Sequence, residues 1–87
     1  MLRLKDSVMK TMVDNEIVLL DKASGMYYGL NETASRMLEL ALEHRRRDEI
    51  LLIIQEEFDA DRPTIESDFD ALLENLINKG LALESEE

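Results

Sequence analysis

The stretch MYYGLNETA, which runs from Met26 to Ala34, constrains the fold of this chain more than any other part of it. It starts as a short run with two adjacent aromatic residues, Tyr27 and Tyr28, which suits an extended strand. Asn31 can then accept a hydrogen bond from a backbone N–H in the first turn of a helix. The stretch therefore predicts a β-strand that leads directly into an α-helix. Alternation along this strand places Met26, Tyr28 and Leu30 on one face and Tyr27 and Gly29 on the other.

Two further strands are predicted before this one. In the run EIVLLD, residues 16–21, four apolar and partly β-branched residues lie between two charged ones, and the run is too short for a helix. Residues 8–13 alternate loosely and predict a strand before it. Turns are expected at residues 13–16 and 22–25, where Gly25 can adopt a positive φ. We therefore expect a three-stranded antiparallel meander over residues 8–30, after a basic and frayed start.

Three helices are predicted after the meander, over residues 31–80. The first runs from Asn31 to about Glu43, and the second begins at a cap on Asp48. The third begins at a cap on Thr64, because Pro63 disfavours a helical conformation at the residue before it. After Gly80, residues 81–83 are expected to be extended and residues 84–87 to form an acidic tail. The apolar residues at helical spacing are Ala34, Met37, Leu38, Ala41 and Leu42 in the first helix, Ile50, Leu51, Ile53, Ile54 and Phe58 in the second, and Ile65, Phe69, Leu72, Leu73, Leu76 and Ile77 in the third. The predicted class is α+β.

Length and composition narrow the function. The chain of 87 residues is expected to form a single domain, residues 1–87, which is too small for a deep catalytic cavity, so we expect a protein that is not an enzyme. It has no cysteine and only one histidine, His44, and we therefore expect no metal and no cofactor. No run reaches the roughly 18 apolar residues of a membrane helix, and the start does not resemble a signal peptide. We expect a soluble, cytoplasmic protein with no membrane partner.

The net charge of −10 is unevenly distributed. Residues 1–47 carry eight Lys or Arg and seven Asp or Glu, whereas residues 48–87 carry two and thirteen. A winged-helix DNA-binding regulator is the alternative of another class, but its reading helix must meet phosphate, and residues 63–79 hold four acidic residues against Lys79 alone. We therefore expect no nucleic-acid partner. The run Arg45-Arg46-Arg47 suits a solvated loop or a charge complement to a helix C-terminus, or else a docking point for an acidic partner.

An ordered set of residues resembles the PqqD-like family, the peptide-recognition domains of ribosomal natural-product biosynthesis. The set consists of VLLDxxSGxYYGLNxTA over residues 18–34, Ile50, Phe58, DFxxLLxxL over residues 68–76, and Gly80-Leu81. The resemblance covers residues 8–83 and implies a three-stranded meander packed on a three-helix winged helix-turn-helix unit. The chain departs from the family at Arg46, where a small polar cap usually precedes the second helix.

The resemblance implies that the leader segment of a precursor peptide adds as a strand to the edge of the third strand and lies against the third helix. A free sheet edge offers unpaired N–H and C=O groups to an extended peptide, which is consistent with this mode. Gly29 leaves the edge uncrowded, and Tyr27 can cover an inserted side chain. The residues expected to contact the peptide are Met26, Tyr27, Tyr28, Gly29 and Leu30 on the strand, and Phe69, Asp70, Leu73, Glu74, Leu76 and Ile77 on the third helix.

The acidic residues of the third helix carry an expectation about the peptide. Glu66, Asp68, Asp70 and Glu74 span its first turns, so some of them must flank the apolar stripe. We therefore expect the partner peptide to carry Lys or Arg near its apolar anchors.

The pattern with Ser24-Gly25 and residues 27–29 looks most like the stand-alone recognition proteins of lasso-peptide pathways. Those proteins act with a leader peptidase and a cyclase, so the resemblance implies such partners. Within the family, the alternative is a partner of a radical enzyme in cofactor or other peptide maturation. A homodimer through the free sheet edge is a further use of the same strand.

Overall fold

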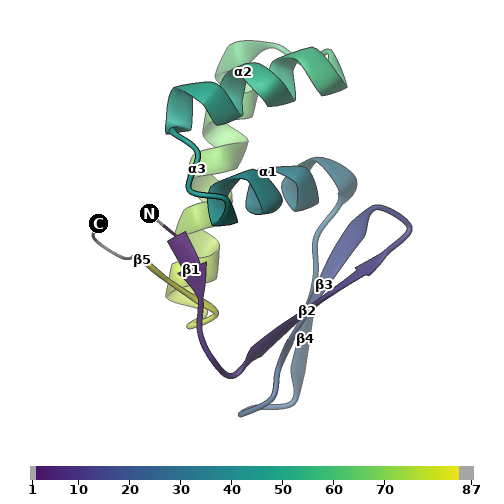
Figure 1. The fold of residues 1–87 in the computed structure, drawn as a ribbon, viewed down its shortest axis with the longest axis vertical. Helices are drawn as coiled ribbons and strands as arrows, with labels where there is room; N and C mark the ends of the chain where they lie inside the picture. Colours follow the sequence, from purple (N-terminus) through teal and green to yellow (C-terminus); the bar gives the residue numbers. More distant parts are fainter. Residues whose placement is uncertain (1, 85–87) are drawn as a thin grey trace.

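The computed structural model describes residues 2–84, which fold into five strands and three helices (Figure 1). The elements are β1 (Leu2–Leu4), β2 (Val8–Val13), β3 (Glu16–Asp21), β4 (Met26–Gly29), α1 (Glu32–Leu42), α2 (Arg47–Phe58), α3 (Arg62–Asn78) and β5 (Ala82–Glu84). The predicted α+β class, with a three-stranded sheet and three helices, is confirmed. The winged helix-turn-helix relationship between the helices stays a prediction.

Strands β2, β3 and β4 form the expected antiparallel meander, with β3 in the middle. Asp14 and Asn15 both adopt positive φ in the two-residue turn between β2 and β3, as the favoured hairpin turn requires. Gly25 has a φ of 76° just before β4. In the same turn, the Asp21 carboxylate accepts a hydrogen bond from the Ala23 N–H at 3.0 Å, which lowers the pKa of Asp21. These local interactions fix the start of β4.

The hydrophobic core lies between the three-stranded sheet and the helices. Ile17 and Leu19 of β3 are fully buried, and α1 packs against this strand. Helices α2 and α3 pack against α1 and against each other (Figure 1). The buried apolar residues are Leu2, Ile17, Leu19, Met37, Leu38, Leu40, Ala41, Ile50, Leu51, Ile54, Ile65, Phe69, Leu72, Leu76, Leu81 and Ala82. The predicted helical stripes supply most of this core, although Leu73 is only half-buried and Ile77 is exposed.

Helix α1 begins and ends where the sequence predicts. The Asn31 side-chain oxygen accepts a hydrogen bond from the Ala34 N–H at 2.8 Å, so Asn31 is its N-cap. Glu43 is its C-cap. Helix α2 differs from prediction, because it begins at Arg47 and its N-cap is Arg46 rather than Asp48. The carboxylate of Glu49 accepts a hydrogen bond from the Arg46 N–H at 3.2 Å. This backbone N–H at the start of the helix therefore has a partner although no small polar residue caps the helix.

The predicted start of α3 was wrong. The helix begins at Arg62 with Asp61 as its N-cap, so Thr64 lies inside the first turn. Pro63 is tolerated there because the first N–H groups of a helix have no intrahelical partner, and proline lacks only such a group. The preference of the residue before a proline for extended backbone is therefore overridden at Arg62. At the other end, Gly80 has a φ of 74° and follows the helix as predicted.

Residues 2–4 form a strand, whereas a frayed segment was expected. Strand β1 pairs antiparallel with β5, and Leu2 is buried against the core. The Lys5 N–H also donates to the Leu81 carbonyl at 3.0 Å. The expected extended segment at residues 81–83 is therefore present as β5, displaced by one residue. Glu84 belongs to this strand rather than to a tail, and residues 85–87 lie outside the described part of the chain.

Candidate functional site

The outer side of β4 is an open sheet edge, since no other strand of residues 2–84 pairs with it. The Leu30 N–H donates to the Ile17 carbonyl at 2.9 Å, which joins these two residues across β3 and the end of β4. Hydrogen-bonded and non-hydrogen-bonded residue pairs alternate along an antiparallel ladder. The N–H and C=O groups of Tyr28 therefore face β3, whereas those of Tyr27 and Gly29 point outward. The edge therefore offers two donors and two acceptors to an extended chain.

The surroundings of this edge are open. A Cβ atom placed on Gly29 would meet no heavy atom within 4 Å. The Tyr27 side chain is 69% exposed and lies on the face of the sheet away from the helices, because it is opposite Leu20 rather than a core residue. Tyr28 lies opposite buried Leu19 and, like Leu30, packs partly against the core. The predicted division of these residues between two faces is confirmed, although Met26 is exposed on the core-side face.

The C-terminal end of α3 lies near β4. The Lys79 Nζ atom lies 5.1 Å from the centre of the Tyr28 ring, which is a cation–π contact just beyond the C-terminal end of α3. Asp68 and Asn75 lie on the same flank of α3 as Lys79 and line a groove of about 470 Å³ between α3 and the start of α1. Asn31, which follows the end of β4 by two residues, lines the same groove. Edge and groove are therefore neighbours.

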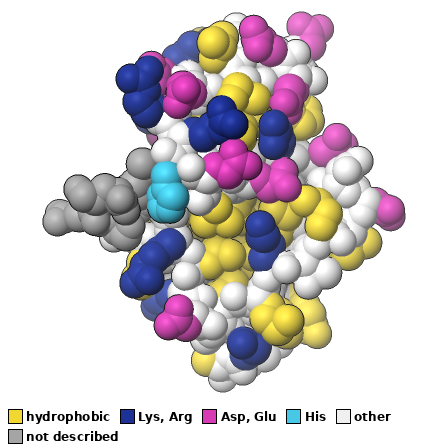
Figure 2. Space-filling view, viewed as in Figure 1, with side chains coloured by type: hydrophobic (Ala, Val, Ile, Leu, Met, Phe, Trp, Pro, Cys, Tyr) yellow, Lys and Arg dark blue, Asp and Glu magenta, His cyan; other side chains and the backbone are white. Residues whose placement is uncertain are grey.

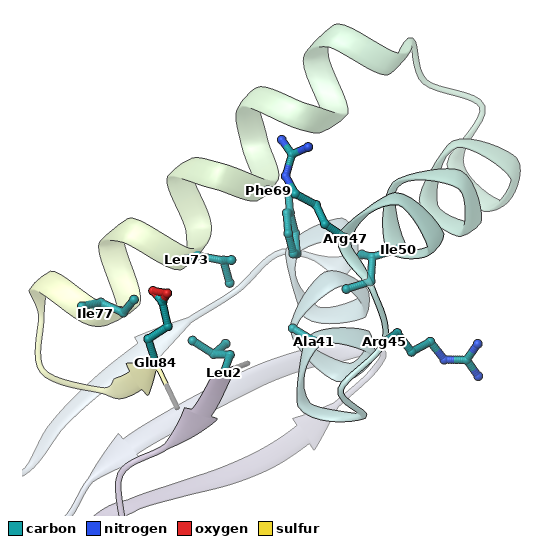
Figure 3. Close-up of a pocket in the computed structure, with 9 residues that line it drawn as sticks. All are labelled: Leu2, Ala41, Arg45, Arg47, Ile50, Phe69, Leu73, Ile77 and Glu84. Carbon is teal, nitrogen blue, oxygen red and sulfur yellow. The ribbon is translucent and has the colours of Figure 1, made fainter. Parts of the chain in front are cut away.

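Leu73 and Ile77 lie on the other flank of α3. Together with Phe69 they line a separate pocket of about 220 Å³, and in Figure 3 they point toward Leu2 and Glu84. None of the residues that line this pocket belongs to β4. The structure therefore does not bring Leu73 and Ile77 together with the strand residues of the predicted site. Their role in peptide binding stays a prediction, as does that of Phe69 and Leu76, which are buried in the core.

Two of the four acidic residues of α3, some of which were expected to flank the apolar stripe, are paired with arginines. Arg47 donates to both carboxylate oxygens of Asp70, at 3.2 and 2.9 Å, and this pairing raises the pKa of Arg47. Glu66 pairs with Arg62 at 3.5 Å. Within the described part of the chain, Asp68 and Glu74 have no such partner. The negative field along α3 is therefore weaker than the sequence predicts, and the basic residue expected in the peptide stays a prediction.

The arginine run is neutralised by its neighbours. Its ion pairs are Arg45–Glu43 at 3.0 Å, Arg46–Asp48 at 3.5 Å and Arg47–Asp70 at 2.9 Å. Figure 2 shows Lys and Arg side chains interleaved with Asp and Glu over the helical part of this face. All three arginines are exposed. The run is solvated, but only Arg45 lies outside α2 and its N-cap, and the three ion pairs leave little free positive charge for an acidic partner.

The described residues hold no group of three or more His, Cys, Asp or Glu that could bind a metal ion. None of the helices in residues 2–84 is long and apolar enough to cross a membrane. Fold and site together define a small α+β module with an open strand edge beside a helical groove. The chain belongs to the PqqD family, because the family model described as "Coenzyme PQQ synthesis protein D (PqqD)" matches residues 16–82.

Two solved structures resemble this protein over almost its whole length. "TbiB1 in Complex with the TbiA(beta) Leader Peptide" is 36% identical, covers 98% of this chain and 99% of its own, and superposes with a TM-score of 0.82. "Lasso peptide synthetase B1 complexed with the leader peptide" is 30% identical, covers 95% and 98%, and has a TM-score of 0.87. The comparison with curated proteins finds no match. The resemblance to PqqD-like domains inferred from the sequence is confirmed.

Two residues near the end of α3 were not predicted from the sequence: Asn75, which lines the groove, and the C-cap Lys79, which contacts Tyr28. Asn75 and Lys79 are spaced four apart, and a helical projection shows that they flank the apolar stripe on the side opposite Leu73 and Ile77. That spacing was a usable signal, but it does not tell which flank faces the strand. Ser35 was also missed, although it stands three residues before Leu38 and therefore on the buried face of α1.

Proposed function

We propose that this protein is a non-catalytic module that binds the leader segment of a ribosomally made precursor peptide by strand addition to β4. The observation that carries the proposal is the outward direction of the N–H and C=O groups of Tyr27 and Gly29 on an open edge. Two proteins that are 36% and 30% identical were solved in complex with leader peptides, which supports it. Peptide side chains that point toward the helices would enter the groove beside Asn75.

In this proposal the bound leader presents the rest of the precursor to separate enzymes in the cytoplasm, a leader peptidase and a cyclase in a lasso-type pathway. The alternative within the family, a partner of a radical enzyme, has less support because both similar structures carry leader peptides and one is a lasso peptide synthetase B1. DNA binding is disfavoured, because α3 keeps Asp68 and Glu74 without a cationic partner among the described residues. A homodimer through β4 would compete with the peptide for the same edge.

A synthetic leader peptide of the cognate precursor is expected to bind with a Kd between micromolar and nanomolar. Four backbone hydrogen bonds at about 1 kcal/mol each are partly offset by the ordering of the peptide, so apolar anchor side chains must supply the remainder. Fluorescence anisotropy with a labelled leader measures this, with a scrambled leader and a DNA duplex as controls. Saturable binding of the duplex, or equal binding of the scrambled peptide, would refute the proposed function. Light scattering over a range of concentrations separates peptide binding from self-association.

A further inference from the structure

The hydroxyl of Ser35 is inserted into the hydrogen-bond ladder between β3 and the end of β4. Ser35 lies in the first turns of α1 and is only 1% exposed. The Ile17 N–H donates to Ser35 Oγ at 2.7 Å, and the hydroxyl donates to the Leu30 carbonyl at 3.3 Å. In a regular antiparallel pair, the Ile17 N–H would donate to the Leu30 carbonyl directly. The hydroxyl therefore replaces one of the two direct bonds of this pair with a bridge.

This bridge lies where the chain leaves the sheet, one residue after the end of β4. The other bond of the pair is direct, because the Leu30 N–H donates to the Ile17 carbonyl at 2.9 Å. The two strands consequently separate on one side only, at the Leu30 carbonyl. Asn31 follows at once and caps α1. A single buried side chain thus joins α1 to both strands, next to the outward groups of Gly29.

We propose that Ser35 is a positioning residue for peptide recognition, because its hydroxyl holds the end of β4 so that Tyr27 and Gly29 keep the register an added strand requires. This inference rests on the proposed leader-binding function. Without the hydroxyl, the Ile17 N–H either loses its partner in a buried position or bonds the Leu30 carbonyl directly. Either change removes the hydrogen-bonded link from α1 to the end of β4, so the end of β4 is free to shift relative to α1. The open edge and the groove that starts at Asn31 are then no longer held in the same relative position.

The test compares three variants at a temperature where all of them are fully folded. Ser35→Ala is expected to weaken binding of the synthetic leader at least about fivefold, whereas Ser35→Thr, which keeps the hydroxyl, stays within about twofold of the natural protein. Ala41→Gly is the matched control, because it destabilises α1 at a buried position that lines the pocket on the other flank of α3. It is expected to leave leader affinity unchanged.

A second readout uses the free protein and needs no peptide. Amide NMR signals of Tyr27 and Gly29 are expected to move in Ser35→Ala and to stay in place in Ala41→Gly. If Ser35→Ala binds the leader as well as the natural protein does, or if Ala41→Gly weakens binding equally, the positioning role is overturned. If the natural protein binds no leader at all, the recognition function fails, while moved Tyr27 and Gly29 signals still establish that Ser35 positions this edge.

Discussion

Gly29→Pro is expected to weaken leader binding at least tenfold, or about 1.4 kcal/mol, and to leave the fold intact. Proline removes the outward N–H of residue 29 and places its ring where the carbonyl of an added strand would lie. No bond to β3 is lost, because this N–H points away from β3. Proline is also tolerated on edge strands when its nitrogen faces solvent. Leader affinity is measured by anisotropy and the free energy of unfolding by urea titration.

Two controls separate the missing N–H from other effects of this substitution. Gly29→Ala keeps the N–H and adds a Cβ into open space. Met12→Pro removes an outward N–H from β2, which is the opposite edge of the sheet. Met12 lies opposite Ile17, whose backbone groups face β4, so the N–H of Met12 points away from β3. Both variants should bind the leader within about twofold of the natural protein. Normal binding by Gly29→Pro, or lost binding by Met12→Pro, would show that the peptide does not add to β4.

Leu38→Ala is expected to lower the free energy of unfolding by about 2 to 5 kcal/mol. Leu38 is fully buried in α1 within the common core, so the substitution leaves a cavity that the surrounding residues fill only partly. Tyr27→Ala is the comparison variant at an exposed position, because the Tyr27 side chain is 69% exposed. Its removal should change stability by no more than about 0.5 kcal/mol and weaken leader binding by about 1 to 2 kcal/mol. Urea titration of both variants measures the stabilities.

The contrast between these two variants distinguishes recognition from folding. Leu38→Ala that remains folded should bind the leader with nearly normal affinity, since Leu38 does not line the groove beside β4. A large loss of stability in Tyr27→Ala would place Tyr27 in the core and remove it from the binding surface. Normal leader binding by a folded Tyr27→Ala would mean that the exposed ring does not contact the peptide.

The strand-to-helix corner was predictable because its signals are local. The Asn31 cap, the turn at Asp14 and Asn15 and the positive φ of Gly25 each depend on residues next to one another in the chain. Binary patterning likewise predicted most of the buried positions of the helices, although it omitted Leu40 and Ser35 and included the exposed Ile77. The class and most of the core could therefore be derived before any coordinates.

Other features depend on contacts between distant residues, and the sequence did not predict them. Strand β1 has three residues, and its partner β5 stands at the other end of the chain, so no local pattern indicates the pairing. The Arg47–Asp70 pair joins positions 23 residues apart and neutralises one of the four acidic residues of α3. The periodicity of α3 identifies two flanks beside the apolar stripe but not which flank faces β4, which is why Leu73 and Ile77 were grouped with the strand residues.

The most direct test of strand addition to β4 is amide hydrogen exchange, measured with and without bound leader peptide. Strand addition predicts slower exchange at Tyr27 and Gly29 on binding, because their N–H groups acquire acceptors on the peptide. The outward amides of Lys10 and Met12 on β2 should be unaffected. If the leader binds with no added protection at Tyr27 and Gly29, or with protection at β2 instead, the peptide does not add to β4.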